Sequence, residues 1–131
     1  MVVAEMNSSH RSSVAWQKGM ALAALVYKVT QNFPVDERFG LTNQLRRAAV
    51  SIPSNIAEGK GRLTTGEFIQ FLGIARVSTL EVQTQLELAS MLGFGDKRGL
   101  VEAESLALEE LKILNASLAT LRAKVAARKL R

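Results

Sequence analysis

The stretch TTGEFIQFLGIARVSTLEVQTQLELASMLGFG, residues 64–95, decides the fold of this chain. Its apolar side chains recur at intervals of three and four residues, which is the period of an α-helix rather than of a strand. Thr64 and Glu67 have the spacing of an N-terminal capping box. Gly93 and Gly95 then interrupt the pattern, as glycine commonly does just after a helix. The sequence therefore predicts one long helix over residues 64–92.

This predicted helix is apolar on two sides. At about 100° per residue, one side is formed by Phe68, Phe71, Leu72, Ala75, Thr79, Val82, Leu86 and Ala89. The side roughly opposite is formed by Val77, Leu80, Thr84, Leu88 and Met91. A helix that is apolar all round is one that is buried all round. We therefore expect contacts on both sides of this helix.

Three more helical patterns flank the first, and they predict helices over residues 14–32, 37–58 and 97–127. Ser13 and Asp36 are the expected N-caps of the first two helices, and Pro34 ends the earlier one. Pro53 falls inside the second pattern, where it predicts a kink rather than a break. Gly59 is expected to follow the end of that helix.

The short connections between these helices favour antiparallel neighbours. The predicted fold is therefore all-α, an up-down-up-down antiparallel four-helix bundle that forms a single domain over residues 14–131. Residues 1–13 are polar and aperiodic, and they are expected to form a flexible tail.

The composition removes most enzyme classes. The 131 residues include no cysteine and one histidine, which excludes disulfides, thiolate metal sites, cysteine nucleophiles and histidine-rich centres. The sequence contains no Glu-x-x-His motif of the kind that di-iron bundles use. We expect no catalytic, cofactor-binding or metal-binding residues, and no enzymatic activity. A magnesium-dependent nuclease that uses helix carboxylates stays as a remote alternative; the residues concerned are Glu81, Glu87, Glu102 and Glu109.

The expected cellular location follows from two signals that the sequence does not show, a membrane-spanning run and a signal peptide. No apolar run approaches the ~18 residues that span a bilayer. The N-terminus has an acidic residue, Glu5, where a signal peptide has a basic one. The expected location is the cytoplasm.

The surplus of apolar surface predicts self-association. A lone bundle has no second layer that buries the outer side of a helix, and large exposed apolar patches usually mark interfaces. Scattered apolar residues on a monomer surface are the alternative. The expected oligomer interface consists of Trp16, Met20, Tyr27, Val50, Val77, Leu80, Leu88 and Met91.

Charge is distributed unevenly along the chain. The net charge is +5, and residues 122–131 carry five basic residues and no acidic one. Such a cluster is typical of phosphate contact, although cations also stabilise an ordinary helix C-terminus. Residues 58–62 are open to two interpretations, an anion-binding loop or a plain connection. The predicted nucleic-acid contacts are Arg46, Arg47, Lys60, Arg62, Arg122, Lys124, Arg128 and Lys129.

A polar stripe lies beside the apolar one on the second helix and comprises Gln44, Arg47, Ser51, Asn55 and Glu58. Catalysis is one interpretation. We favour a hydrogen-bond network that fixes the register of packed helices.

Two runs, FPVDERFGL (residues 33–41) and QLRRAAVSIPSNIAEG (residues 44–59), carry a family resemblance. Together with Glu67-Phe68 and Ile74-Ala75-Arg76, they resemble the bacterial four-helix-bundle proteins encoded in intervening sequences of 23S ribosomal RNA genes. The similarity covers residues 14–95 closely and the last helix by pattern. It implies a ring-shaped homopentamer with no known enzymatic activity, for which nucleic-acid binding is the usual suggestion. More distantly, the chain is similar to accessory proteins of diversity-generating retroelements, which are basic pentamers that bind nucleic acid and a reverse transcriptase.

The expected function is therefore that of a non-catalytic, oligomeric, basic protein that binds RNA or DNA through phosphate contacts. It needs no cofactor. The alternative is a structural or adaptor oligomer whose ligand is another protein.

Overall fold

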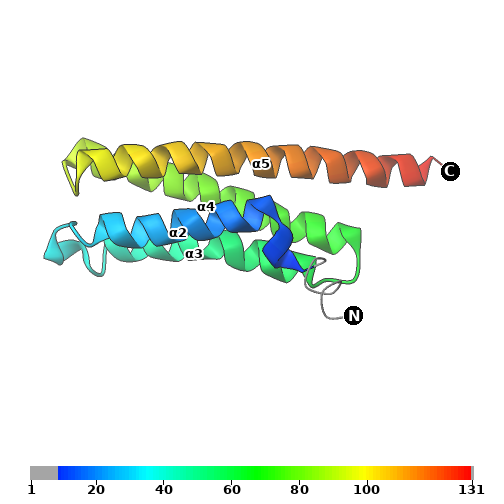
Figure 1. Cartoon of the computed structure of the whole chain (residues 1–131), viewed down its shortest axis with the longest axis horizontal. Helices are drawn as coiled ribbons and strands as arrows, with labels where there is room; N and C mark the ends of the chain where they lie inside the picture. The colour runs from blue at the N-terminus through cyan, green and yellow to red at the C-terminus, as the bar shows by residue number, and fades with distance from the viewer. Residues whose placement is uncertain (1–8, 131) are drawn as a thin grey trace.

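The computed structural model describes residues 9–130, and these form an all-α chain without strands. Four helices dominate it: α2 (Val14–Thr30), α3 (Leu41–Lys60), α4 (Thr65–Leu92) and α5 (Lys97–Lys129). Two 3₁₀ turns, η1 (His10–Ser12) and η2 (Val35–Glu37), precede α2 and α3. Consecutive helices run in opposite directions (Figure 1). The predicted four-helix bundle is confirmed for this part of the chain.

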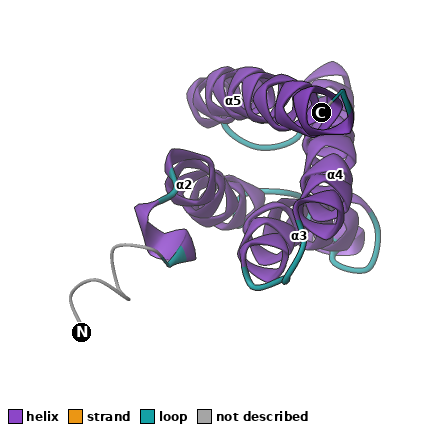
Figure 2. Cartoon of the chain, turned by 90° about the vertical axis from the view of Figure 1, so that its right-hand side faces the viewer, coloured by secondary structure: helices purple, strands orange, loops and turns teal. Residues whose placement is uncertain are grey.

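The four helices pack in a closed cycle. Helix α3 packs against α2 and α4, and α5 packs against α4 and α2 (Figure 2). One apolar core lies between them, with fully buried side chains from every helix, among them Leu22, Leu45, Leu86 and Leu114. The predicted inner side of α4 is confirmed in this core by Leu72, Ala75, Val82, Leu86 and Ala89. No helix of residues 9–130 is both long and apolar enough to cross a bilayer.

Side-chain caps begin three of the helices as their sequences predict or allow. The Ser13 hydroxyl accepts a hydrogen bond from the Trp16 amide at 3.3 Å, and Thr64 accepts one from the Glu67 amide at 3.2 Å. The Asp96 carboxylate accepts one from the Gly99 amide at 3.1 Å. Each bond satisfies an amide that has no partner inside its helix.

The start of α3 differs from its prediction. The pattern placed it after Asp36, but that residue lies in η2, and α3 begins at Leu41 after Gly40. The Glu37 carboxylate, rather than Asp36, accepts the Leu41 amide at 3.0 Å. A short polar side chain such as that of Asp36, close after Pro34, suits a tight turn as well as a helix cap, and in this chain Asp36 forms part of the turn. On the other side of the same connection, α2 ends at Thr30 instead of residue 32.

The expectation that Gly59 ends α3 is wrong. The helix continues to Lys60, and Gly61 is its C-cap. A Cβ atom on Gly59 would lie 2.8 Å from Phe71 Cβ and 2.9 Å from Phe68 Cδ1. Gly59 therefore permits the close approach of α3 to α4. Pro53 lies inside α3, and the helix continues through it.

Helix α5 projects beyond the rest of the bundle at its C-terminal end (Figure 1). Arg76 of α4 holds α5 one turn before that point through a hydrogen bond of 2.7 Å from its Nε to Asn115 Oδ1. Leu118 is the last buried residue of the helix. Residues 119–130 are called the overhang below. The N-terminal tail was predicted over residues 1–13, of which 1–8 lie outside the described residues.

Candidate nucleic-acid interface

The overhang carries four exposed cations: Arg122, Lys124, Arg128 and Lys129. No acidic residue occurs in α5 after Glu110. The overhang also has no aromatic residue. The result is a projecting helix end with a net positive charge, which the negative end of the helix dipole partly offsets.

Two of the other predicted cations lie at the same end of the bundle. Lys60 and Phe68 line an open groove of about 360 Å³ together with Ser117, Thr120 and Leu121 of α5. This groove joins the C-terminus of α3 to the base of the overhang. Arg62 follows Lys60 in the connection to α4. The structure thus brings six of the eight predicted cations to one end, which we call the basic end.

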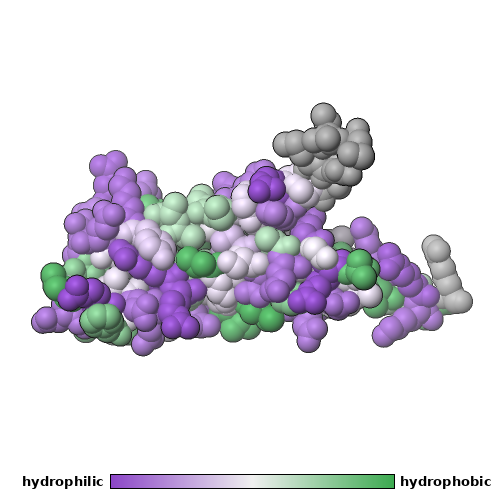
Figure 3. All heavy atoms as spheres, turned by 90° about the horizontal axis from the view of Figure 1, so that it is seen from below, coloured by the Kyte–Doolittle hydropathy of each residue, from purple (hydrophilic) through white to green (hydrophobic). Residues whose placement is uncertain are grey.

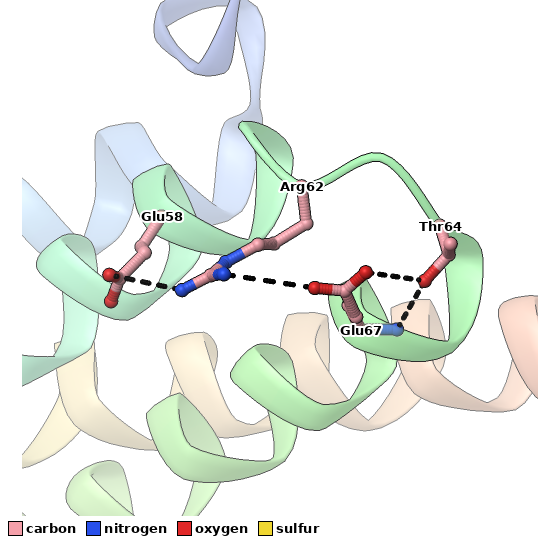
Figure 4. Close-up of polar contacts among 4 residues, drawn as sticks. All are labelled: Glu58, Arg62, Thr64 and Glu67. Atoms are coloured by element: carbon pink, nitrogen blue, oxygen red, sulfur yellow. Dashed lines mark hydrogen bonds and ion pairs between the residues drawn. The ribbon is translucent and has the colours of Figure 1, made fainter.

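Arg62 is held at this end by two acidic neighbours. Its guanidinium lies 3.5 Å from a carboxylate oxygen of Glu58 and 3.7 Å from one of Glu67, in the capping box of α4 (Figure 4). It also stacks over the ring of Phe71, 4.6 Å from the centroid. These ion pairs are solvent-exposed, so they contribute little to stability and are screened by salt. They orient Arg62 and partly offset its charge.

Arg46 and Arg47 lie elsewhere. They precede Lys60 by 14 and 13 residues on α3, which places them about 20 Å away along the helix axis. Arg46 Nε donates to Thr30 Oγ1 at 2.8 Å, and its guanidinium covers the ring of Tyr27 at 4.6 Å. Arg46 therefore ties α3 to α2. Arg47 is exposed beside a polar hollow of about 320 Å³ between α3 and α4.

The polar stripe of α3 forms the expected hydrogen-bond network in part. Ser51 Oγ and Ser78 Oγ are 2.8 Å apart and join α3 to α4. Asn55 Nδ2 donates to Ser51 Oγ at 2.9 Å and to the Ser51 carbonyl at 2.8 Å. Because Ser78 is buried, this contact fixes the relative register of the two helices.

The predicted interface residues lie on two separate apolar surfaces. Trp16, Met20, Tyr27 and Val50 line a groove of about 500 Å³ between α2 and α3, together with Pro53 and Ala57. Val77, Leu80, Leu88 and Met91 are exposed on the outer side of α4. A space-filling view shows apolar patches among polar side chains on one face of the molecule (Figure 3).

Glu110 is a chemically unusual residue that the sequence interpretation missed. Its side chain is fully buried, and neither carboxylate oxygen has a hydrogen-bond partner within the described residues. A Cβ atom on Gly19 would lie 2.7 Å from its Oε2. The pKa of Glu110 is raised to about 8, chiefly by burial and also by the nearby carboxylate of Glu109, whereas Lys18 acts to lower it. The sequence feature that could have identified Glu110 is its position between Ala107 and Leu114 on the apolar stripe of α5.

Metal-ligating side chains do not gather in the part of the chain that the structure describes. Within residues 9–130, no group of three or more histidine or acidic side chains is arranged to hold a metal ion. The carboxylates considered for a nuclease are dispersed: Glu109 pairs with Lys18 at 3.0 Å, and Glu81 lines the polar hollow beside Arg47.

Comparison with known proteins identifies a family for most of the chain. The model of the family described as 23S rRNA-intervening sequence protein matches residues 11–116. A crystal structure of a protein of unknown function from the S23 ribosomal protein family of Bacteroides thetaiotaomicron is similar, with a TM-score of 0.72 and 24% identity. The match covers 80% of this chain and 98% of that one, and it shows the shared fold. No curated protein matches the chain.

Proposed function

Because the chain belongs to the family of 23S rRNA-intervening sequence proteins, we propose that it is a non-catalytic, self-associating basic protein that binds nucleic acid. Binding takes place through phosphate contacts from the basic end, and it requires no cofactor. The protein acts in the cytoplasm, where RNA and DNA are both accessible.

The observation that supports this proposal most directly is the grouping of cations at one end. The overhang brings Arg122, Lys124, Arg128 and Lys129 beside Lys60 and Arg62, with Glu58 and Glu67 as the acidic residues that pair with Arg62. Exposed Lys and Arg side chains release counterions when they contact phosphates, which supplies sequence-independent affinity. The absence of aromatic side chains from the overhang argues against the stacking of single-stranded bases.

Self-association multiplies this charge. The two apolar surfaces, one a groove between α2 and α3 and one a ridge on α4, differ in shape and sequence. Different surfaces that bind each other generate a closed ring when the rotation permits it. We propose a ring-shaped homopentamer, in accord with the family resemblance. In such a ring the basic ends recur, and the positive potential that attracts nucleic acid increases.

Neutralisation of the overhang tests this function. In the variant R122Q/K124Q/R128Q/K129Q, the fold should persist because all four side chains are exposed. The affinity for labelled RNA and DNA, measured by fluorescence anisotropy at about 50 mM salt, should fall by at least tenfold, since about four phosphate contacts are lost.

The matched control removes the same charge from the opposite end of the bundle, as K28Q/R38Q/K97Q/R98Q. This variant should retain most of the affinity. Equal losses in the two variants would mean that net charge, rather than the basic end, governs binding. No binding by the unmodified protein at this salt would overturn the proposal.

One observation favours the adaptor alternative. An open groove of about 670 Å³ between α4 and α5 combines Met91 and Leu108 with the carboxylates of Glu87 and Glu104. Such a surface suits a cationic amphipathic helix of another protein. Affinity capture that returns one dominant protein partner, unaffected by nuclease and lost in the charge reversal E87K/E104K, would favour this function.

A further inference from the structure

The overhang has four distinct sides. Leu118, Leu121 and Val125 continue the stripe that faces the bundle, and they are buried or partly buried. At about 100° per residue, Lys129 lies within about 20° of Arg122 on one flank. Lys124 and Arg128 lie together on the other flank, about 200° and 240° from Arg122. The side that faces away from the bundle carries four exposed alanines, with Thr120 at its edge and Leu130 at the last position of the overhang; the alanines are Ala119, Ala123, Ala126 and Ala127.

We propose that the overhang enters the major groove of duplex DNA, with its alanine side toward the base edges and its two cationic flanks toward the phosphates of the two strands. This inference rests on the proposed function and specifies the nucleic acid that the basic end binds.

The dimensions of the overhang fit this groove. Its 12 residues, 119–130, are about 18 Å long, and a helix with side chains is about 10–12 Å wide. The major groove of B-form DNA is about 12 Å wide and about 8.5 Å deep, and it admits a helix. Alanine is short enough to let the helix axis approach the floor of the groove. Arg and Lys are long enough to reach the phosphates on either side.

The same features disfavour other nucleic acids. The major groove of an A-form RNA duplex is deep and narrow, and side chains cannot enter it. Single strands are bound by aromatic stacking platforms, and the overhang has none. An alanine side offers methyl groups but no hydrogen bonds to the base edges, so it discriminates little among sequences. The expected ligand is therefore duplex DNA of any sequence.

The connection between α3 and α4 limits how far the overhang enters the DNA groove, and its cations add phosphate contacts. Lys60 lines the surface groove of the protein together with Thr120 and Leu121, so it lies next to the first residues of the overhang. Arg62 lies in the same connection, oriented by Glu58 and Glu67. A DNA backbone that passes over the overhang would meet Lys60 next, one turn closer to the bundle.

The test compares the full-length protein on a DNA duplex, an RNA duplex of the same sequence and the DNA single strand, by fluorescence anisotropy. We expect the DNA duplex to bind at least about tenfold more tightly than the RNA duplex, because only its groove admits the helix. Methyl green, a major-groove ligand, should displace the protein, whereas netropsin, a minor-groove ligand, should not.

The double variant A123F/A127F makes the alanine side bulky without a change of charge. It should lose at least about tenfold in affinity for the DNA duplex, because the wider helix no longer reaches the groove floor. The matched control A21F/S105F places the same side chains at exposed positions of α2 and of the bundled half of α5, and it should bind as the unmodified protein does. Circular dichroism verifies that both variants keep their helical content.

Two outcomes overturn the inference in distinguishable ways. Equal affinity for the two duplexes, or full binding by A123F/A127F, would contradict entry into the groove while leaving phosphate binding at the basic end intact. Absence of binding to all three nucleic acids would remove the proposed function together with this inference.

Discussion

Glu110 shows how a single residue departs from the pattern around it. It occupies a position between Ala107 and Leu114 where the other residues of the stripe are apolar. An ionised carboxylate there is shielded from bulk water, and no hydrogen-bond donor within residues 9–130 reaches it, so the protonated form is favoured. The space it fills is left by Gly19, whose missing side chain admits Oε2. Charge at this site therefore depends on pH within the physiological range.

The pKa of Glu110 predicts the direction of the stability change with pH. Folding raises this pKa from 4.5 to about 8, so the folded state binds more protons between these values. The contribution of Glu110 to the free energy of unfolding is therefore greatest below about pH 4.5. It falls as the pH rises to about 8, by up to roughly 4–5 kcal/mol. In Glu110→Gln, the free energy of unfolding measured in urea should lose this slope. Persistence of the slope in the variant would show that other groups cause it.

Gly59 and Gly73 predict opposite responses to the same substitution. Gly59→Ala should destabilise the fold by about 1–3 kcal/mol, because the new Cβ meets Phe68 and Phe71. Gly73→Ala should stabilise it by up to about 1 kcal/mol, because Gly73 lies within α4 and nothing lies within 4 Å of its Cβ position. Thermal unfolding of the two variants tests this prediction. Equal shifts of the unfolding temperature would contradict the packing described for α3 and α4.

At the scale of the element, α5 is a helix with two roles. Its first two-thirds pack on α2 and α4, and its end projects from the bundle (Figure 1). Leu118 is the last buried residue, and only Leu121 and Val125 are partly buried in the part of the helix that follows. Beyond Leu121 the helix is supported by alanines, which have the highest helix propensity.

The overhang should therefore contribute binding rather than stability. Removal of residues 122–131 is expected to leave the free energy of unfolding within about 0.5 kcal/mol, as is usual for exposed surface positions. The same truncation should abolish tight binding of nucleic acid. A loss of more than about 2 kcal/mol in urea denaturation would show that the overhang belongs to the folding unit.

The apolar periodicity of the sequence predicted the helices well. It predicted the contacts between helices less well. The helical spacing in residues 64–92 and the capping box at Thr64 led directly to α4. The start of α3 was misplaced because Asp36 suits a cap and a turn equally, and only the folded chain shows that Glu37 supplies the cap. Gly59 was taken for a helix end, since its close contact with Phe68 and Phe71 depends on how α3 packs on α4.

The candidate site was predicted by residue type but not by position. Clustered charge in the sequence identified Arg122, Lys124, Arg128 and Lys129. It did not reveal that Arg46 is bound to Thr30 and Tyr27 on the adjacent helix. Sequence distance also hid the proximity of Lys60 to the base of the overhang, because about 60 residues separate them. Glu110 was missed because the other carboxylates of α5 suggested a solvated face.

At the scale of the whole molecule, apolar surface and charge serve different parts of the proposed function. Apolar residues are exposed along the α2–α3 groove and on α4, whereas the basic end lies beyond them on the bundle axis. In the proposed assembly, this separation would let copies associate side by side while their basic ends stay free. A ring built in this way presents several overhangs in one direction.

Self-association gives a prediction at this scale. The protein should have a solution mass several times 14.3 kDa by light scattering. The variant M20E/V50E places two charges in the α2–α3 groove, where both side chains are exposed in a single chain. It should shift the mass to that of the monomer, because burial of an unpaired charge in an interface is costly. A folded, soluble monomer before any substitution would contradict the assembly.

The measurement that tests the central claim most directly is the salt dependence of DNA binding by the basic end. For the unmodified protein, the logarithm of the binding constant should fall linearly with the logarithm of salt concentration, with a slope of about −0.9 per phosphate contact. In R122Q/K124Q/R128Q/K129Q the slope should become shallower by about 3–4, since four contacts are removed. An unchanged slope would show that these four residues do not contact phosphates, and it would contradict the proposed function.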